Sequence, residues 1–299
     1  MLEALITGGV LRKALQLNRT TLNPRPLIAS HPTVTAANGK IYVYGGLTPA
    51  LASSNAFHCF DPATGLWTTL SSPSSLRRSA ALGYYNGIIY LYGGYDHGNA
   101  TMFNTVFSYN IATDTWTTTG LTSGILRQEF ASVVVGNRLY CFGGFNTGYV
   151  STNAYYTMGS NTWTDIAPQA GIRYTGCATD GVNIYLVGGQ TDAGMLNTVY
   201  RYNIAANSWT TLAVLPAAGH SCAVMIVDGY LVVYSGYNNG AYGSAIYTMD
   251  LNLGTWKTVV DTGPVQGIEG YTQLGRSLYL VGGFDGTARV ASMNQIEAL

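Results

Sequence analysis

Charged side chains are scarce in this sequence. Asp, Glu, Lys and Arg make up 9% of the 299 residues, whereas about 25% is usual for soluble globular proteins. The formal net charge is zero. Proteins that bind nucleic acid normally need a basic field, so we expect no nucleic-acid partner. The solubility of the chain must depend on Ser, Thr, Asn, Gly and the hydroxyl groups of 23 tyrosines.

Signals of cross-linking and membrane insertion are also missing. The four cysteines contain no CxxC pair, so we expect buried apolar thiols, with no disulfide framework, no metal site and no cofactor. They are Cys59, Cys141, Cys177 and Cys222. No apolar run approaches the length of about 18 residues that a membrane span needs. Glu3 precedes the short N-terminal apolar stretch and Arg12-Lys13 follows it, which is the reverse of a secretory signal.

The sequence contains instead a repeat of nearly constant length. Five tryptophans are separated by 49, 47, 46 and 47 residues, and they are Trp67, Trp116, Trp163, Trp209 and Trp256. A di-glycine keeps the same step, at Gly45-Gly46, Gly93-Gly94, Gly143-Gly144, Gly188-Gly189 and Gly282-Gly283, and Ser235-Gly236 occupies the fifth place. Such a period indicates units that bury their apolar faces only against their neighbours.

Each unit contains the pattern of four short strands. In residues 78–119, the apolar run Ser79-Tyr85 and the alternating run Ile88-Tyr92 flank Asn86-Gly87, and two shorter runs follow. Asn-Gly and related pairs accept the positive φ angles of a tight hairpin, and they recur at this place in other units. The sequence therefore predicts an all-β fold of repeated four-stranded antiparallel units.

This pattern resembles the kelch repeat, in which a hydrophobic hairpin ends in Gly-Gly and a Trp follows about 20 residues later. The resemblance covers residues 17–299 and implies a β-propeller with blades around a channel. Six di-glycine places and five tryptophans predict six blades. We expect the segment Arg19-Thr20-Thr21-Leu22 to supply the fourth strand of the last blade, near Ser292-Glu297. Pairing of the chain ends would close the ring.

Residues 1–16 lie outside the repeat, so we divide the chain into an N-terminal arm and one propeller domain, 17–299. The arm contains Ala4-Leu5-Ile6-Thr7-Gly8-Gly9, which has the pattern of the second strand of a blade, an apolar run that ends in Gly-Gly. Two interpretations stay open. The arm is either a loosely docked terminus or an attachment segment that binds another chain.

Turns in a four-stranded blade alternate between the two sides of the ring. The loops after the di-glycines and the connections between blades therefore emerge on one side, and we expect ligand contact there. The predicted contact residues in the loops are Tyr95, Asp96, His97, Phe145, Asn146, Asp192, Tyr237, Asn238, Phe284 and Asp285. Solvated loop tips are our interpretation of the three aspartates, since calcium needs clustered oxygen ligands.

Four potential donors stand 15 or 16 residues before their unit's di-glycine place, at the mouth of the innermost strand. They are Arg78, Arg127, Arg173 and His220. The three arginines resemble the arginine-lined pocket with which kelch substrate adaptors hold acidic peptide loops, because a guanidinium fork suits a carboxylate. Alternatively, they hydrogen-bond to neighbouring blades and hold the ring together. Glu129 lies two residues after Arg127 and could neutralise it.

We predict recognition of a protein or glycan without catalysis. The composition resembles that of exposed fibre, tail and decoration proteins of bacteriophage particles, which suggests an attachment role on a virion or another external surface. Some bacterial kelch propellers resemble sialic-acid epimerases, and the arginines beside Glu129 or His220 keep that alternative open. An intracellular adaptor is the second alternative. The scattered histidines show no ligand spacing for copper.

Overall fold

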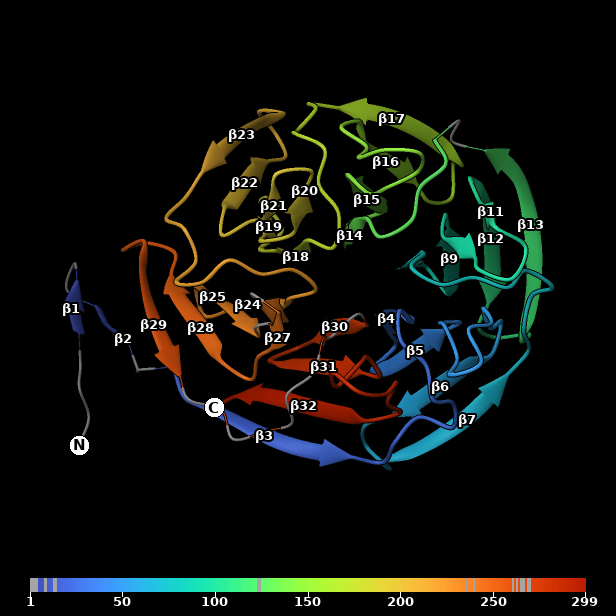
Figure 1. Ribbon diagram of the computed structural model, residues 1–299, viewed down its shortest axis with the longest axis horizontal. Coiled ribbons are helices and arrows are strands. Elements are labelled where there is room, and N and C mark those ends of the chain that lie inside the picture. Colours follow the sequence, from blue (N-terminus) through green and yellow to red (C-terminus); the bar gives the residue numbers. More distant parts are fainter. Residues whose placement is uncertain are drawn as a thin grey trace.

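The structure is a computed structural model. It describes residues 5–7, 10–12, 15–122, 125–234, 236–238, 240–259, 261, 263, 267 and 270–299. In this part of the chain there are no helices, and six four-stranded antiparallel sheets surround a central axis (Figure 1). The prediction of a six-bladed propeller is confirmed.

In each blade, the first strand named lines the channel and the other three follow outward in order. Blade 1 has β4 (Thr33–Ala37), β5 (Lys40–Tyr44), β6 (Phe57–Asp61) and β7 (Leu66–Leu70). Blade 2 has β8 (Ala81–Tyr85), β9 (Ile88–Tyr92), β12 (Thr105–Asn110) and β13 (Thr115–Thr122). Blade 3 has β14 (Ala131–Val135), β15 (Arg138–Phe142), β16 (Asn153–Thr157) and β17 (Thr162–Ile166).

Blades 4 to 6 repeat this order. Blade 4 has β18 (Gly176–Thr179), β19 (Asn183–Val187), β22 (Val199–Asn203) and β23 (Ser208–Thr211). Blade 5 has β24 (Ala223–Val227), β25 (Tyr230–Tyr234), β28 (Ile246–Asp250) and β29 (Thr255–Val259). Blade 6 has β30 (Tyr271–Leu274), β31 (Ser277–Val281), β32 (Met293–Ala298) and β3 (Leu17–Leu22).

The ring closes as the sequence predicts. β3 pairs with β32 over six residues, from Leu17 opposite Ala298 to Leu22 opposite Met293. The blue and red strands therefore lie side by side in one sheet (Figure 1). A short hairpin of β1 (Leu5–Thr7) and β2 (Val10–Arg12) precedes β3. Whether the arm binds another chain stays a prediction.

Arg19 takes the place that a tryptophan occupies in the other blades. Trp116 packs on Tyr44 of the preceding blade at 6.0 Å between ring centroids. In blade 6 the Arg19 guanidinium lies 5.1 Å from the centre of the Tyr234 ring, again in the preceding blade. It also forms an ion pair of 2.6 Å with Asp261. A cation–π contact therefore replaces an aromatic ring contact at this blade boundary.

The hydrophobic core lies between blades. One cluster joins Tyr44 and Phe57 of blade 1 to Leu91 and Tyr109 of blade 2, all fully or almost fully buried. Four of the five tryptophans, Trp67, Trp116, Trp209 and Trp256, also donate their indole N–H across a blade boundary, as Trp116 Nε1 does to Ser71 O at 2.7 Å. Each blade is therefore stabilised by its neighbours, as a repeat architecture requires.

The di-glycines let the chain of the next blade approach closely. Gly45 has a φ of +62°, and a Cβ there would lie 2.2 Å from Arg77 O. Only glycine combines this conformation with this contact. A buried arginine then reaches the glycine carbonyl in three blades: Arg25 donates to Gly45 O, Arg77 to Gly93 O and Arg127 to Gly143 O. Ser235, in the fifth di-glycine place, lies outside the described residues.

His58 belongs to one of these buried networks. Its Nδ1 accepts a hydrogen bond of 3.3 Å from Arg25 Nε. Burial, and second the neighbouring Arg25 cation, lower the pKa of His58 to about 4. The imidazole is therefore neutral in the folded protein over the range in which a solvated histidine takes up a proton.

We expect His58 to destabilise the propeller as the pH falls from about 6.5 to about 4, because only the unfolded chain binds the proton there. The full effect is about 3 kcal/mol in the free energy of unfolding. Urea titrations from pH 7 to pH 4 measure it, with His58→Asn compared to the wild type. The exposed His97 provides the control variant His97→Asn. An unchanged pH dependence in His58→Asn would contradict the prediction.

Candidate functional site on the loop face

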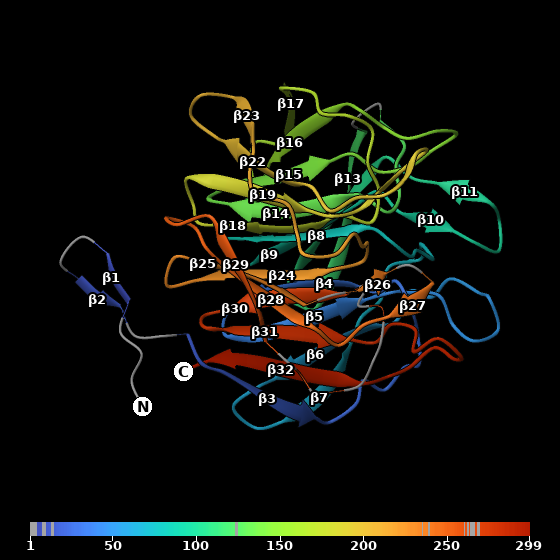
Figure 2. The same cartoon turned by 60° about the vertical axis from the view of Figure 1, so that its left-hand side comes forward.

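One side of the ring carries the loops that follow the di-glycines and the connections between blades. We call it the loop face. In blades 2, 4 and 5 these loops form small hairpins: β10 (Tyr95–Asp96) with β11 (Thr101–Met102), β20 (Gln190–Thr191) with β21 (Gly194–Met195), and β26 (Tyr237–Asn238) with β27 (Ala241–Tyr242). β10, β11, β26 and β27 project from the same side of the molecule (Figure 2).

A collar of five residues lies at the channel mouth on this face. Each is two residues before the innermost strand of its blade, and each has a φ between 51° and 59°. The five are His31, Ser79, Glu129, Tyr174 and Ser221. Each of the last four donates its backbone N–H to the carbonyl of the collar residue before it, at 2.8 to 3.3 Å. The left-handed conformation is costly for non-glycine residues, and such residues gather at functional sites.

Two arginines and one collar residue form an ion-pair triad. Arg78 Nη1 lies 3.2 Å from Glu129 Oε1, and Arg173 Nη1 lies 3.2 Å from Glu129 Oε2. The Glu129 side chain is 4% exposed, whereas those of Arg78 and Arg173 are 11% and 24% exposed. Two cations share one anion, so the triad carries an excess positive charge that solvent screens only in part.

Aromatic rings position both arginines. The Arg78 guanidinium lies 5.2 Å from the Tyr95 ring centre, and that of Arg173 lies 4.8 Å from Phe145 and 5.3 Å from Tyr149. Cation–π contacts of this kind hold a guanidinium plane in place while leaving its N–H groups available.

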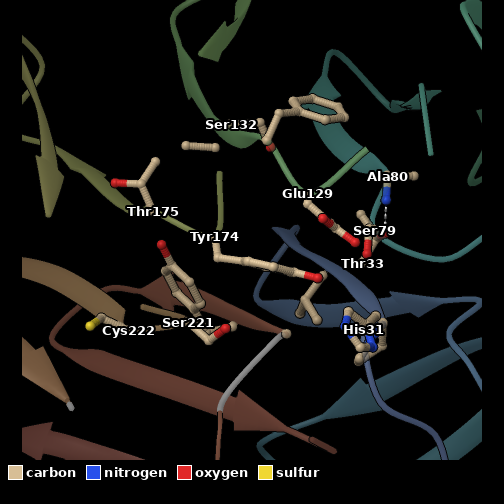
Figure 3. A pocket seen from close by; sticks show the side chains of 16 residues that line it. His31, Thr33, Ser79, Ala80, Glu129, Ser132, Tyr174, Thr175, Ser221 and Cys222 are labelled. Carbon is tan, nitrogen blue, oxygen red and sulfur yellow. Dashed lines mark hydrogen bonds between the residues drawn. The ribbon is translucent and has the colours of Figure 1, made fainter. Parts of the chain in front are cut away.

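A cavity of about 130 Å³ opens beside the triad. Figure 3 shows Glu129, Ser79, Thr33, Tyr174 and Ser221 around it from several blades, and Cys222 also lines it. Hydroxyl groups and one carboxylate dominate this lining, so the cavity suits a small polar group.

Tyr271 closes the inner end of this cavity. Its hydroxyl group crosses the channel from blade 6 to blade 4, where it donates to Cys177 O at 3.1 Å and accepts from Cys177 N at 2.6 Å. The residue also borders a second cavity on the other side of the ring. Burial raises the pKa of the Tyr271 hydroxyl well above its usual range, so it stays a donor.

A row of aromatic rings continues from the triad across the loop face. The Arg173 guanidinium lies 5.0 Å from Tyr174, and Tyr174 stacks on His220 at 5.2 Å. His220 contacts Tyr237 at 5.1 Å, and Tyr237 contacts Tyr242 at 4.9 Å. The row therefore joins blades 3 to 5 into one surface of stiff, amphipathic side chains.

The structure separates Arg127 from the other arginines that sequence analysis grouped with it. Arg78, Arg173 and His220 each form a backbone bridge to the loop of their own blade, and Gln128 has the equivalent bridge in blade 3. Arg127 is fully buried, and its Nη1 donates to Gly143 O at 3.0 Å. It corresponds to Arg77, so its placement fits the alternative in which an arginine holds adjacent blades together.

Several predicted loop residues stabilise their own turns. Asp96 is buried and accepts from Gly98 N and Asn99 Nδ2. Asn146 Oδ1 accepts from two backbone N–H groups of its loop, and Asp285 Oδ1 does the same. Asp192 and His97 are exposed, and Tyr95, Phe145, Asn238 and Phe284 are half-buried.

Tyr174, Tyr149 and Tyr242 complete the site and were not predicted. Tyr174 follows Arg173 directly, at the collar position that Glu129 occupies in blade 3. This equivalence within the repeat was a usable signal. Tyr149 and Tyr242 lie in loops of different length, so their position could not be inferred from the period.

The cysteines are buried and unpaired within the described part of the chain. Burial raises the pKa of the Cys141 thiol to about 12 and that of Cys222 to about 11, so both are protonated at neutral pH. Among the described residues, no group of three His, Cys, Asp or Glu side chains is placed to hold a metal ion. No helix in that part of the chain is long and apolar enough to cross a membrane.

Comparison with known proteins identifies the repeat. The family model described as the KLHDC2/KLHL20/DRC7 Kelch-repeats domain matches residues 13–178, and the Kelch motif matches residues 172–214. The chain belongs to the kelch-repeat family. The family match includes β3, so the strand that closes the ring is part of the kelch region.

Two curated kelch relatives are 27% and 29% identical to this chain over the aligned residues. Kelch-like protein terF of Aspergillus terreus is 29% identical over 237 residues, which are 73% of this chain and 51% of that protein. Kelch domain-containing protein 10 of Homo sapiens is 27% identical over 284 residues, covering 81% and 62%. The chain therefore spans only about half the length of these curated kelch relatives.

A solved structure has the same overall fold. "Structure of YjhT" superimposes with a TM-score of 0.79 at 15% identity, covering 92% of this chain and 99% of that one. At this identity the likeness concerns the propeller fold alone.

Proposed function

We propose that this kelch propeller is a recognition module that binds an acidic segment of a partner protein on its loop face and performs no catalysis. The observation that carries the proposal is the triad of Arg78, Glu129 and Arg173, in which two largely buried guanidinium groups share one carboxylate. A partner carboxylate would supply the second anion. Charge-assisted hydrogen bonds of this kind are about twice as strong as neutral ones.

Unused hydrogen-bond donors support this assignment. Within the described residues, Arg78 Nε and Arg173 Nε are buried and have no hydrogen-bond partner. Buried polar groups are normally satisfied, so a donor without a partner is a reason to expect a ligand or an ordered water. Both guanidinium groups therefore have capacity left after they pair with Glu129.

Exposed aliphatic side chains on the same face favour a protein as the partner. Ile28, Leu76 and Leu126 have equivalent positions in the connections that enter blades 1, 2 and 3, and they are 48%, 37% and 43% exposed. Leu51, in the blade 1 loop, is 53% exposed. Apolar groups beside buried charged anchors are typical of protein interfaces.

The arginines give a direct test with a defined probe. We expect the variant with Arg78→Gln and Arg173→Gln to bind a fluorescein-labelled hexaglutamate peptide about 100-fold more weakly than the wild type, because two charge-assisted hydrogen bonds are lost. Fluorescence anisotropy measures the affinity, and a hexaglutamine peptide is the neutral control. Arg138→Gln, on an exposed residue at the start of β15, is the matched control variant.

Glu129→Gln separates charge from structure in the same assay. Removing the internal carboxylate should strengthen hexaglutamate binding, since the probe then has no competitor for the two guanidinium groups. If the arginine double variant binds the probe as well as the wild type and melts at the same temperature, the acidic-segment assignment is wrong.

The epimerase alternative is less well supported by the site. The cavity of about 130 Å³ is smaller than the pockets of about 300–1,000 Å³ that usually hold small-molecule ligands. Both oxygens of Glu129 are engaged by guanidinium groups at 3.2 Å. Incubation with a carboxylated sugar and analysis of the anomers by NMR tests it, because turnover would establish catalysis.

The biological setting remains a separate hypothesis. An adaptor role within a longer protein is compatible with the kelch match and with the greater length of the relatives. Glycan binding and a place on a virus particle depend on composition alone. A glycan array and mass spectrometry of purified particles would test them.

A further inference from the structure

Three aromatic rings, the imidazole of His220 and one carboxylate line a hollow between the loops of blades 5 and 6. Tyr242 stands between the other two rings, 4.9 Å from Tyr237 and 5.8 Å from Phe284, and both pairs are edge-to-face. Asp285 follows Phe284 at the rim. The hollow has a volume of about 670 Å³ and opens to the loop face. We call Tyr237, Tyr242, Phe284 and Asp285 the aromatic cage.

Close packing fixes the central ring of the cage. A Cβ atom at Gly267 would lie 2.3 Å from Tyr242 Cε1, and a Cβ at Gly286 would lie 3.7 Å from Tyr242 Cδ2. The Tyr242 ring therefore rests on two residues without side chains. Because the ring is held in this way, the cage exists before any ligand arrives.

The carboxylate at the rim is ionised and partly uncommitted. Asp285 Oδ1 accepts from Thr287 N, Thr287 Oγ1 and Ala288 N at 2.7 to 2.8 Å. These hydrogen bonds hold the pKa of Asp285 below its usual value. Within the described residues, no hydrogen bond or ion pair reaches Oδ2. Arg289, the arginine of the same loop, donates to Ser30 Oγ at 3.1 Å.

The repeat itself contains an occupied version of this arrangement. In blade 3, Phe145 and Tyr149 hold the guanidinium of Arg173 from blade 4 at 4.8 and 5.3 Å. Tyr237 corresponds to Phe145, because both form the backbone bridge to the residue that precedes the collar. In blade 6 the residue that corresponds to Arg173 is Gly267, which forms the same bridge to Phe284. The chain therefore supplies a cation to the rings of blade 3 and none from that position to the rings of blade 5.

We propose that the aromatic cage binds a cationic side chain, the guanidinium of arginine or the ammonium of lysine, from a partner protein. The ring faces attract a cation through their quadrupoles, and the Asp285 carboxylate adds a full negative charge beside them. A neutral sugar could donate a hydroxyl group to that carboxylate, but only a cation gains both the ion pair and the attraction of the ring quadrupoles.

The cage and the triad have opposite charge preferences on one face. Tyr174 and His220 link them through contacts of 5.0 to 5.2 Å. A partner segment that engages both would carry an acidic and a basic residue a short distance apart. This assignment goes beyond the proposed function, and the cage can be tested without any acidic ligand.

Arginine and citrulline probes provide the test. They have nearly the same shape and differ in charge, so we would titrate Nα-acetyl-arginine methylamide and Nα-acetyl-citrulline methylamide into the full chain. Amide shifts of Gly240 and Gly286, observed by NMR, report occupancy of the cage. We expect the arginine probe to bind about tenfold more tightly than the citrulline probe, and Phe284→Leu or Asp285→Asn to remove most of that difference.

Two further variants separate the cage from the triad and from folding. Tyr237→Leu removes a second ring of the cage without filling the hollow, and we expect it to weaken binding of the arginine probe as Phe284→Leu does. The double variant Arg78→Gln with Arg173→Gln should bind the arginine probe like the wild type, whatever it does to hexaglutamate. Equal binding of arginine and citrulline, or unchanged arginine binding in a folded Phe284→Leu protein, would overturn the proposal.

Discussion

Removal of residues 1–22 is expected to abolish the cooperative melting transition of the propeller. This deletion takes away β3, whose six residues pair with β32 and complete blade 6. It would uncover Met293 and Ile296, which are at most 1% exposed, and leave β32 as an open edge. Open edges recruit other strands, so we also expect association that increases with protein concentration. Calorimetry and light scattering measure the two effects.

Deletion of residues 1–14 is the matched control. Leu15 packs against the core between blades 5 and 6, and Leu299 N donates to Gln16 O at 2.9 Å. A chain that begins at Leu15 keeps these contacts, so its melting temperature should stay within a few degrees of that of the full chain. A monomeric 23–299 fragment that melts like the full chain would show that ring closure contributes little stability.

Arg77→Ala is expected to lower the free energy of unfolding by about 3–5 kcal/mol, through the loss of a buried side chain and of its hydrogen bonds. Arg77 is 1% exposed. Its guanidinium donates to Ser75 Oγ, Gly93 O, Thr105 O and Thr105 Oγ1 at 2.7 to 3.3 Å. It also lies 4.2 Å from the Phe103 ring centre. The variant would create a cavity lined by acceptors without donors.

Urea unfolding at neutral pH measures this loss, with Arg138→Ala as the control. Arg138 is exposed at the start of β15, where its guanidinium lies 4.5 Å from the Tyr155 ring centre, and we expect its removal to change the free energy of unfolding by less than about 1 kcal/mol. Arg77→Lys should recover only part of the stability, because an ammonium cannot satisfy several acceptors spread around a planar fork. A loss below 1 kcal/mol in Arg77→Ala, on the scale of surface substitutions, would refute the structural role.

The fold could be predicted because its signals are local and repeated. Each di-glycine marks the end of a strand where the next blade passes within contact distance, as Gly45 does over Arg77 O. Each tryptophan marks the outermost strand, and Arg19 could be recognised as its substitute from the Thr-Thr-Leu that follows. A pattern that recurs six times averages out the irregularities that mislead single predictions.

The site was harder to predict because a shift of one residue changes the direction of a side chain. Arg127 stands 16 residues before its di-glycine, whereas Arg78 and Arg173 stand 15 before theirs. Because of this difference of one residue, Arg127 is buried as Arg77 is, and Gln128 forms the backbone bridge next to the collar. In extended chains the two directions alternate, so spacing must be matched to the residue.

The left-handed collar had no sequence signal at all. Glu129, Tyr174 and Ser79 are not residues that favour a positive φ as glycine or asparagine does. Their conformation results from the hydrogen bonds between successive blades, which depend on long-range packing. The ion pairs of Glu129 with Arg78 and Arg173 join three blades, and only the assembled ring brings these side chains together.

Tyr271 obstructs the central channel between the two cavities that it borders. Its side chain reaches from blade 6 to blade 4, where the hydroxyl group bonds to Cys177 N and O, so it stands between the cavity on the loop face and the cavity on the other side. We therefore expect a ligand that enters from the loop face to be held above Tyr271. The cavity on the loop face therefore favours a ligand that ends there, such as a protruding turn or a single side chain, over an extended strand that would continue through the ring.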